Sequence, residues 1–410
     1  MSRSFARARV GAGLEVLTEE MPGVRSAAIG IWVRTGSIHE SPGQMGVSHL
    51  LEHMVFKGTP TRSARELALV LERVGGSLDA YTTREHTCYQ ARVLDEHLDL
   101  AVEVLADLVL NPLLRAEDLA LEREVVLEEI ATVEDEPDDL IFDLHSELLW
   151  NGHPYGYSIL GTKESVGALS DVDLRRVHDR AYRQPNLLIA AAGNVKASRV
   201  QQLAERWFGA APDGARLDPV AQPHPCTASF THLERQSAQT HVVFGTHTFG
   251  HGDPRRYAMV MLSNAFGGGM SSRLFQRVRE ELGLAYAVLT FQSFHQHAGT
   301  AGVYVGTRHS RADEAIAVIR DEYTRLMRHG LSAEELEDIK GQVKGQIVLS
   351  LESSGSRLHR LAGTALYDEE YLEIDELLRR VDAVTLDEVA ALAAEYFDPD
   401  RQVVVRLGPK

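Results

Sequence analysis

The stretches "LRAEDLALEREVVLEE" at 114–129 and "LSAEELEDIKGQVKGQ" at 331–346 begin alike, 217 residues apart. Each opens with Leu, a variable residue, Ala and Glu, then an acidic residue and Leu, an order typical of entry into a long helix. A pattern that recurs at a fixed offset indicates a repeated structural unit. We therefore predict that the fold is a tandem duplication of one α+β unit.

The two copies differ at acidic positions of this helix. At the same offset, Glu122 corresponds to Ile339 and Glu129 corresponds to Gln346. The second copy therefore lacks both carboxylates. If the duplicated unit carries chemistry, we expect only the first copy to have kept it.

The patterns around the two helices support the duplication. In the first half, strand patterns precede two helices, a strand pair and three longer helices, expected at 13–20, 26–37, 48–59, 63–76, 77–93, about 95–110, about 116–136 and about 138–149. In the second half, the order recurs with strands in 240–250, a helix ending near 264–273, strands in 285–294 and 301–307, and helices from about 311 onward. Ser63 and Glu66 fit a capping box at the start of the second helix.

A chain of 410 residues exceeds what one hydrophobic core usually organises, so we expect two domains. The segment 208–225, "FGAAPDGARLDPVAQPHP", is dense in Gly, Pro and Ala, as is typical of a linker. The predicted boundaries are 1–210 for the first domain, 211–226 for the linker and 227–410 for the second domain.

The formal net charge of -17 at pH 7 argues against a nucleic-acid partner, because phosphate binding needs clustered Lys and Arg. The same charge suits either basic substrates or plain solubility, and both interpretations stay open. Only Cys88 and Cys226 are present, far apart in the sequence, so we expect neither a disulfide framework nor a cysteine metal cluster.

No run of about 18 apolar residues occurs, so we expect no membrane span. The start, residues 1–20, contains arginines but no apolar segment of signal-peptide length. We therefore predict a cytoplasmic protein. The Arg and Ser content at the start leaves an organellar location as the alternative.

"SHLLEHMVFKGT" at 48–59 places two histidines and a glutamate on one side of a predicted helix. His49 and His53 are four residues apart, so both imidazoles can reach one metal ion. Glu52 lies on the same side, in the reverse order of the H-E-x-x-H zinc signature, where a carboxylate can take a proton from bound water. The alternative is an ordinary helix with satisfied polar residues, although burying such groups without partners is costly.

A catalytic zinc needs a third protein ligand and one open position. The helix expected at about 116–136 offers several carboxylates. Glu122 and Glu129 are seven residues apart and share a face, while Glu128 points away from Glu122. Helix geometry favours Glu129 as the ligand and Glu122 as a supporting acid, and it leaves Glu128 as an alternative.

"HLLEHMVFKGT", followed 76 residues after His53 by the last Glu of "EREVVLEEI", resembles the pitrilysin-type inverzincin zinc metallopeptidases, most closely the bacterial branch related to the mitochondrial processing peptidase. The resemblance covers essentially the whole chain. It implies that His49, His53 and Glu129 hold one Zn²⁺ per chain. It also implies that Glu52 is the general base and that Glu122 supports the ligands.

Two further segments agree with this family. "GGSLDAYTTREHTCY" at 75–89 is similar to the family's substrate-binding edge strand, which pairs with an extended peptide. The residues that would contact the substrate there are Asp79, Ala80, Tyr81 and Thr82, and the family usually has Asn where this sequence has Asp79. "GGGMSSRLFQRVREELGLAYAVLTF" at 267–291 looks like the family's second-domain signature, in which Arg279 and Tyr286 would reach the substrate.

The resemblance implies two tandem homologous α/β-sandwich domains, each a mixed, mainly antiparallel sheet with helices packed on one face, forming half of a clamshell chamber. Residues 1–210 would be the zinc-binding catalytic domain, and 227–410 a copy without the zinc motif. The implied function is a zinc-dependent endopeptidase for peptides or unfolded segments, basic ones included, that works as a homodimer or with a homologous subunit. The alternative is a non-catalytic or partner-dependent subunit of a processing-peptidase-like complex.

Overall fold

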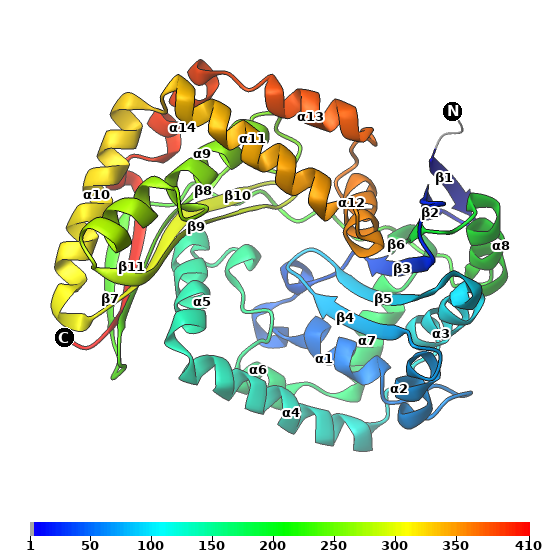
Figure 1. Cartoon of the computed structure of the whole chain (residues 1–410). Coiled ribbons are helices and arrows are strands. Elements are labelled where there is room, and N and C mark those ends of the chain that lie inside the picture. The colour runs from blue at the N-terminus through cyan, green and yellow to red at the C-terminus, as the bar shows by residue number, and fades with distance from the viewer. Residues whose placement is uncertain (1–3) are drawn as a thin grey trace. The chain divides into compact units, whose positions relative to one another are not determined.

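The computed structural model describes residues 4–410, which divide into two compact units. The first unit contains the chain up to Ala131, Tyr157–Val220 and Ser350–Tyr371, and the second contains Thr132–Gly156, Ala221–Leu349 and Leu372–Lys410. Each unit is built on one sheet with helices packed against it (Figure 1). The predicted fold class, two tandem α+β domains with mainly antiparallel sheets, is confirmed.

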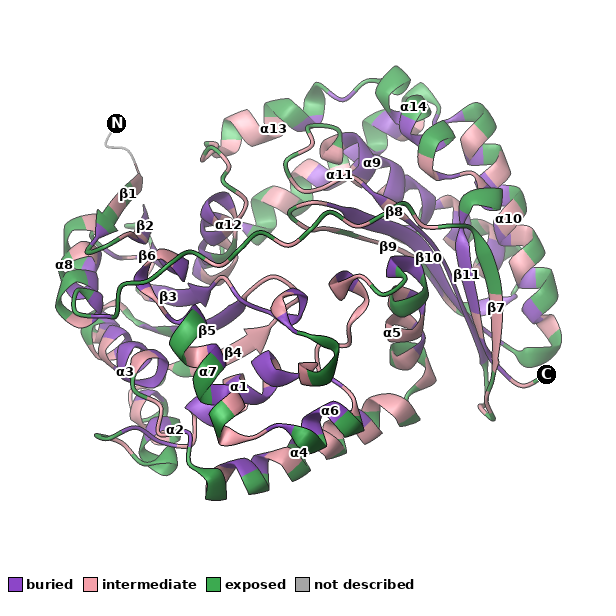
Figure 2. Ribbon diagram, turned by 180° about the vertical axis from the view of Figure 1, so that it is seen from behind, coloured by how far each residue is buried: buried purple, intermediate pink, exposed green. Residues whose placement is uncertain are grey.

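Six strands form the sheet of the first unit. In spatial order they are β1 (Phe5–Val10), β2 (Leu14–Glu20), β6 (Leu187–Gly193), β3 (Ser26–Val33), β5 (Thr87–Leu94) and β4 (Ser77–Thr82). β2 and β6 pair in parallel, and the other neighbours pair antiparallel. The central strands are buried on both faces, as Figure 2 shows for β3 and β6.

The two faces of this sheet belong to two apolar clusters, because successive side chains of a strand point to opposite sides. Ile29 and Ile31 of β3 enter the larger cluster, whereas Ala28 and Trp32 enter the other. The helices that contribute to the larger cluster are α1 (Val47–Val55), α2 (Ala64–Glu72), α3 (Leu98–Leu110), α4 (Ala116–Asp135), α6 (Lys163–Ala168), α7 (Asp171–Ala181) and α8 (Ala197–Phe208).

The opposite face of the sheet is covered by α12 (Ser354–Leu366), a helix from the second half of the chain (Figure 1). Its buried apolar side chains are Leu358, Leu361, Ala362 and Ala365. Arg357 forms an ion pair with Glu19 of β2, and the side chain of Glu19 is fully buried. Arg34 donates hydrogen bonds of 3.0 and 2.7 Å to two carbonyls in the last turn of α12. The structure thus adds a helix to the face that the sequence left uncovered.

Five strands form the sheet of the second unit. In spatial order they are β7 (Ser229–Glu234), β11 (Val403–Gly408), β8 (Thr240–Thr248), β10 (Gly299–Thr307) and β9 (Ala285–Phe294). One face packs against α9 (Arg256–Gly267), the π-helical segment Phe275–Glu281, α10 (Ala312–His329), α11 (Ala333–Ser350), α13 (Ile374–Asp382) and α14 (Leu386–Tyr396).

The other face of this second sheet is covered by α5 (Pro137–Trp150), a helix from the first half of the chain. Ile141 of α5 is buried in a cluster with Val243 and Val405 of the sheet. Each unit therefore takes one helix from the opposite half of the chain.

The start of the repeated helix keeps the offset seen in the sequence. α4 begins at Ala116 and α11 begins at Ala333, again 217 residues apart. Ile339, which replaces the acid at the position of Glu122, is buried in the core of the second unit, and Gln346 is exposed. The second copy therefore uses an apolar side chain where the first has a carboxylate.

The predicted linker, 211–226, overlaps residues 212–228, which form neither helix nor strand. Within this segment the chain passes from the first compact unit, which includes Val220, to the second, which includes Ala221. The boundaries of the duplicated domains at 210 and 227 stay a prediction. Across residues 4–410, no helix combines the length and the hydropathy needed to cross a membrane.

Candidate metal centre

The helix that contains the two histidines is fixed at its start by a carboxylate from outside the helix. Gly46 precedes α1 with a φ of 87°, and a Cβ there would lie 2.4 Å from the carbonyl oxygen of Leu160. Glu40 accepts hydrogen bonds from the backbone N–H groups of Gly46, at 2.8 Å, and Ser48, at 2.9 Å. These bonds satisfy donors of the first turn that have no partner within a helix. The buried Glu40 thus fixes the backbone directly before His49.

Three of the predicted site residues converge on one point. Ligand atoms of His49, His53 and Glu129 all lie within 4.8 Å of one another. Nε2 of each histidine lies 3.7 Å from an oxygen of Glu129. Atoms bound to a tetrahedral zinc at about 2.1 Å lie about 3.4 Å apart, so this spacing is close to that of a metal site. Glu128 is exposed on α4 and is not part of the cluster.

The hydrogen bonds and charges of the cluster suit a cation. Nδ1 of His53 lies 3.1 Å from Oε2 of Glu122, which is also ion-paired with Lys57. We assign the Nδ1 proton of His53 to this bond, so Nε2 keeps its lone pair for a metal. Burial, together with His53, lowers the pKa of His49 to about 4, and its imidazole is therefore neutral at pH 7. Two imidazole nitrogens and the carboxylate of Glu129 are a donor set that Zn²⁺ prefers.

Glu52 lies beside this cluster and is held by a hydroxyl group. Oγ1 of Thr82 donates a hydrogen bond of 2.6 Å to Oε2 of Glu52. Burial raises the pKa of Glu52 above its ordinary value; the bond from Thr82 and the proximity of His53 act against this, and Glu129 adds to it. The bond from Thr82 fixes one oxygen of the carboxylate and leaves the second oxygen to accept a proton.

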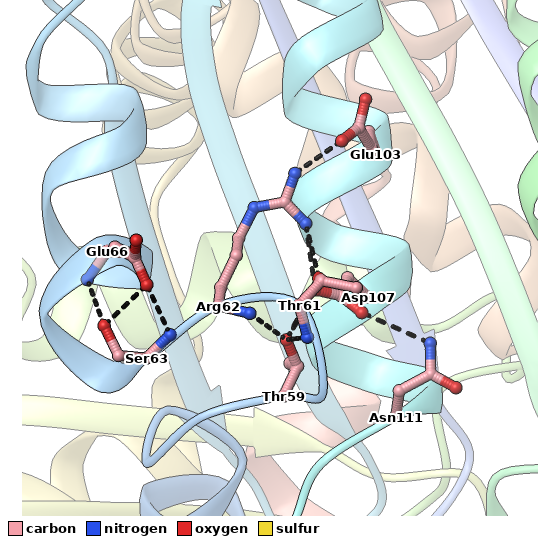
Figure 3. Close-up of polar contacts among 8 residues, drawn as sticks. All are labelled: Thr59, Thr61, Arg62, Ser63, Glu66, Glu103, Asp107 and Asn111. Atoms are coloured by element: carbon pink, nitrogen blue, oxygen red, sulfur yellow. Dashed lines mark hydrogen bonds and ion pairs between the residues drawn. The ribbon is translucent and has the colours of Figure 1, made fainter.

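The loop after α1 is anchored by one carboxylate (Figure 3). The hydroxyls of Thr59 and Thr61 each donate to Oδ2 of Asp107 at 2.6 Å, and Nη1 of Arg62 donates to the same oxygen at 2.9 Å. Arg62 also pairs with Glu103 on α3. Because α3 packs against β3 and β5, these contacts tie the loop after the histidine helix to the core.

The predicted substrate strand, β4, is an edge of its sheet. Within the described residues it pairs with β5 alone, so the other side of its backbone is free for a further strand. Ala80 packs toward the larger cluster, on the same side as Thr82. Tyr81 faces the other side, where its hydroxyl accepts a hydrogen bond of 3.2 Å from Nε1 of Trp32. Asp79 alternates with Ala80 and lies on the side of Tyr81.

Arg279 and Tyr286 belong to the second unit and contact each other. The guanidinium of Arg279 lies 4.8 Å from the ring centre of Tyr286 and 4.6 Å from that of Phe275, within the range of cation–π attraction. Tyr286 is 78% exposed, near the start of the edge strand β9. Their action on a substrate stays a prediction.

Three contacts of the site were missed by sequence reasoning. Lys57 follows His53 by four residues, and that spacing could have indicated that both reach the same carboxylate. The bond from Thr82 to Glu52 joins residues 30 positions apart and has no local signal. The contact of Glu40 with the start of α1 depends on the loop between them, whose path the sequence does not predict.

Comparison with known proteins adds independent information. Residues 15–163 match the model of a family described as insulinase (peptidase family M16), and residues 169–343 match one described as the peptidase M16 inactive domain. An uncharacterized zinc protease of Bacillus subtilis is 39% identical over 95% of this chain and 94% of that protein. An uncharacterized zinc protease of Streptomyces coelicolor is also 39% identical, over 95% of this chain and 86% of that protein.

Two solved structures share the fold. A peptidase M16 inactive domain from Pseudomonas fluorescens superposes with a TM-score of 0.94 at 23% identity, covering 99% of this chain and 98% of that one. A protease from Helicobacter pylori superposes with a TM-score of 0.90 at 20% identity, covering 99% of each chain. At these identities the two structures support the architecture alone.

Proposed function

The chain belongs to the insulinase family of peptidases, family M16, and from this membership we propose that it is a zinc-dependent endopeptidase with His49, His53 and Glu129 as metal ligands. The observation that carries the proposal is the convergence of ligand atoms of these three side chains within 4.8 Å of one another, beside the partly buried Glu52. The zinc protease names of two relatives that are 39% identical support the same activity.

The proposed chemistry divides between the metal and the chain. Zn²⁺ at this site would supply a Lewis acid that polarises the scissile carbonyl and makes water more acidic. Glu52 takes a proton from the attacking water and delivers it to the leaving amine. Thr82 holds the carboxylate of Glu52, and Glu122 holds the imidazole of His53.

The proposed substrates are peptides and unfolded segments. An extended peptide would add to the free edge of β4 along Ala80 and Tyr81, and Asp79 would contact it there. Arg279 and Tyr286 would bind the peptide or stabilise the oxyanion. The net charge of -17 favours basic peptides.

The proposed assembly is a dimeric chamber in the cytoplasm. A second copy of the chain would complete the chamber, with a homologous subunit as the alternative partner. One chain supplies both the zinc motif and the Arg279 and Tyr286 pair, which favours two identical subunits. We propose one Zn²⁺ per chain.

Glu52→Gln tests the assignment of the general base. The variant should keep its zinc and lose cleavage of a quenched peptide by at least about 100-fold, the contribution typical of a general base. Peptide turnover and metal content are measured on the same preparation. Turnover equal to that of the wild type would refute the role of Glu52.

Metal analysis separates the peptidase from the alternative, a non-catalytic subunit. The peptidase should purify with close to one zinc per chain, lose turnover on chelation and regain it when zinc is added back. A chain that neither contains zinc nor rebinds it would favour the non-catalytic subunit.

A further inference from the structure

A cysteine and a histidine, Cys226 and His247, lie side by side in the second compact unit. Sγ of Cys226 lies 3.1 Å from Nδ1 of His247 on β8. The backbone N–H of Cys226 donates to the same Nδ1 at 3.2 Å. Nδ1 of His247 is therefore an acceptor whose lone pair the backbone N–H and the thiol share, and it lies where it can take the proton of the thiol.

Cys226 lines a cavity of about 540 Å³. Its lining includes Trp150, His153, His224, Pro225 and Cys226, and it contains no Asp, Glu, Lys or Arg. Cys226 is partly exposed, so a small molecule in the cavity can reach the sulfur.

His247 is the base that serves this thiol. Of the histidines that line the cavity, His153 bonds to other groups: Nε2 donates to the carbonyl of Ala221 at 2.8 Å and Nδ1 accepts the N–H of Tyr155 at 3.2 Å, and in the described part of the chain no hydrogen bond joins it to the thiol. His224 is exposed and no hydrogen bond joins it to the thiol among the described residues. Partial burial acts to raise the pKa of the Cys226 thiol, but its hydrogen bonds with His247 outweigh this and lower the pKa below its ordinary value.

We propose that Cys226 and His247 form a reactive thiol–imidazole pair, at which small peroxides and other small electrophiles modify the sulfur. With hydrogen peroxide, the thiolate of Cys226 attacks one oxygen and the O–O bond breaks. The sulfur is oxidised to sulfenic acid, and the departing hydroxide takes the proton from the His247 imidazolium to leave as water. The peroxide is reduced by the same two electrons.

The other cysteine of the chain is an internal control. Cys88 lies on β5 and is fully buried, and burial raises the pKa of its thiol above the ordinary value. The same reagent in the same sample should therefore modify Cys226 and leave Cys88 unmodified while the chain is folded.

The test is alkylation of the full chain with iodoacetamide across a pH series, followed by mass spectrometry of the two cysteine peptides. For Cys226, the midpoint of the alkylation rate against pH should lie below about pH 8.5, the ordinary pKa of a thiol. It should also lie below the midpoint of the same cysteine in the urea-unfolded chain. This midpoint depends on the pKa of the thiol, whereas the access of the reagent changes only the absolute rate. A midpoint equal to or above that of the unfolded chain would overturn the proposal.

Three variants and a second reagent complete the test. His247→Gln should raise the midpoint, and it should abolish the dimedone-trapped sulfenic acid that dilute hydrogen peroxide produces at Cys226. The matched control, His224→Gln, removes an imidazole that lines the cavity and should leave both readouts unchanged. Cys226→Ser should remove the label. If His247→Gln does not fold, the wild-type midpoint decides alone, and dimedone labelling that survives in a folded His247→Gln variant would contradict the pairing.

Discussion

Glu122 orients His53, one of the proposed metal ligands. Its Oε2 accepts the Nδ1 proton of His53 at 3.1 Å, while Lys57 pairs with Oε1. The cation of Lys57 compensates the charge of a carboxylate that is largely removed from water. Partners of this kind fix the tautomer of a metal-binding histidine, and their loss typically lowers metal affinity about 10- to 100-fold. Glu129, which faces the two histidines directly, should matter more.

Glu129→Gln should lower zinc affinity by more than about 100-fold, because it removes the only charged ligand of the proposed set. Glu128→Gln, at the next and exposed position of α4, should leave the affinity within about twofold, since it removes no ligand. Competition with a chromophoric chelator measures both variants. The opposite order of effects would make Glu128 the third ligand.

Thr82 should act as a positioning residue for Glu52. Thr82→Val keeps the shape of the side chain and removes the donor of the 2.6 Å bond. A hydrogen bond to a charged group contributes about 1.5–3 kcal/mol, so kcat should fall about 10- to 100-fold with little change in KM. Thr82→Ser, which keeps the hydroxyl, should restore most of kcat, and both variants should retain zinc. Equal loss in the two variants would point to packing instead of the hydrogen bond.

At the scale of elements, the histidine helix depends on contacts at both of its ends. Glu40 accepts hydrogen bonds from N–H groups before and within the first turn. Asp107 accepts three hydrogen bonds from the loop after the last turn. Burial acts to raise the pKa of Asp107, but the hydrogen bonds from Thr59, Thr61 and Arg62 outweigh it and hold the pKa below its ordinary value of 3.8.

Asp107→Asn should lower the free energy of unfolding by about 2–3 kcal/mol at pH 7, because it weakens several hydrogen bonds to a buried charge. A carboxyl with a lowered folded-state pKa stabilises the fold above its ordinary pKa, and this contribution is lost as the pH falls through the folded value. The difference between wild type and variant should therefore shrink below pH 3.8. Urea unfolding at pH 7 and at pH 3 measures it.

The control for this prediction lies on the same helix. Asp99 of α3 forms an ion pair with Arg199, and both side chains are about half exposed. Exposed pairs contribute about 0–1 kcal/mol, so Asp99→Asn should have a small effect. If both variants lose the same stability, the anchoring role of Asp107 is refuted.

Elements whose signals are local were predictable, and those that depend on distant contacts were not. The capping box of α2 was predicted from Ser63 and Glu66, three residues apart, and is confirmed by reciprocal hydrogen bonds. His49 and His53 are one helical turn apart, so their convergence could be predicted from spacing. Glu129 could not be separated from Glu128 by spacing alone, because both lie on the same helix and only the fold shows which one faces the histidines.

At the scale of the whole molecule, the two halves of the chain exchange helices. α12 from the second half covers the first sheet, and α5 from the first half covers the second sheet. Neither exchange has a signal in the sequence, since both helices have ordinary amphipathic patterns that suit either sheet. The consequence is that neither half of the chain contains all the elements of a complete compact unit.

Cleavage within residues 212–228 should therefore leave the two fragments associated. The helix α12 buries Leu358 and Leu361 against the first sheet, and α5 buries Ile141 against the second. A fully buried side chain of this size contributes about 1.5–3 kcal/mol, so separating the fragments would expose several such groups on each. A protease site inserted between Asp218 and Pro219, cut in the folded protein, should give two fragments that elute together in size-exclusion chromatography and separate only in denaturant. The first fragment expressed alone should lack the cooperative unfolding of the nicked protein, and fragments that part under native conditions would show that the exchanged helices are dispensable.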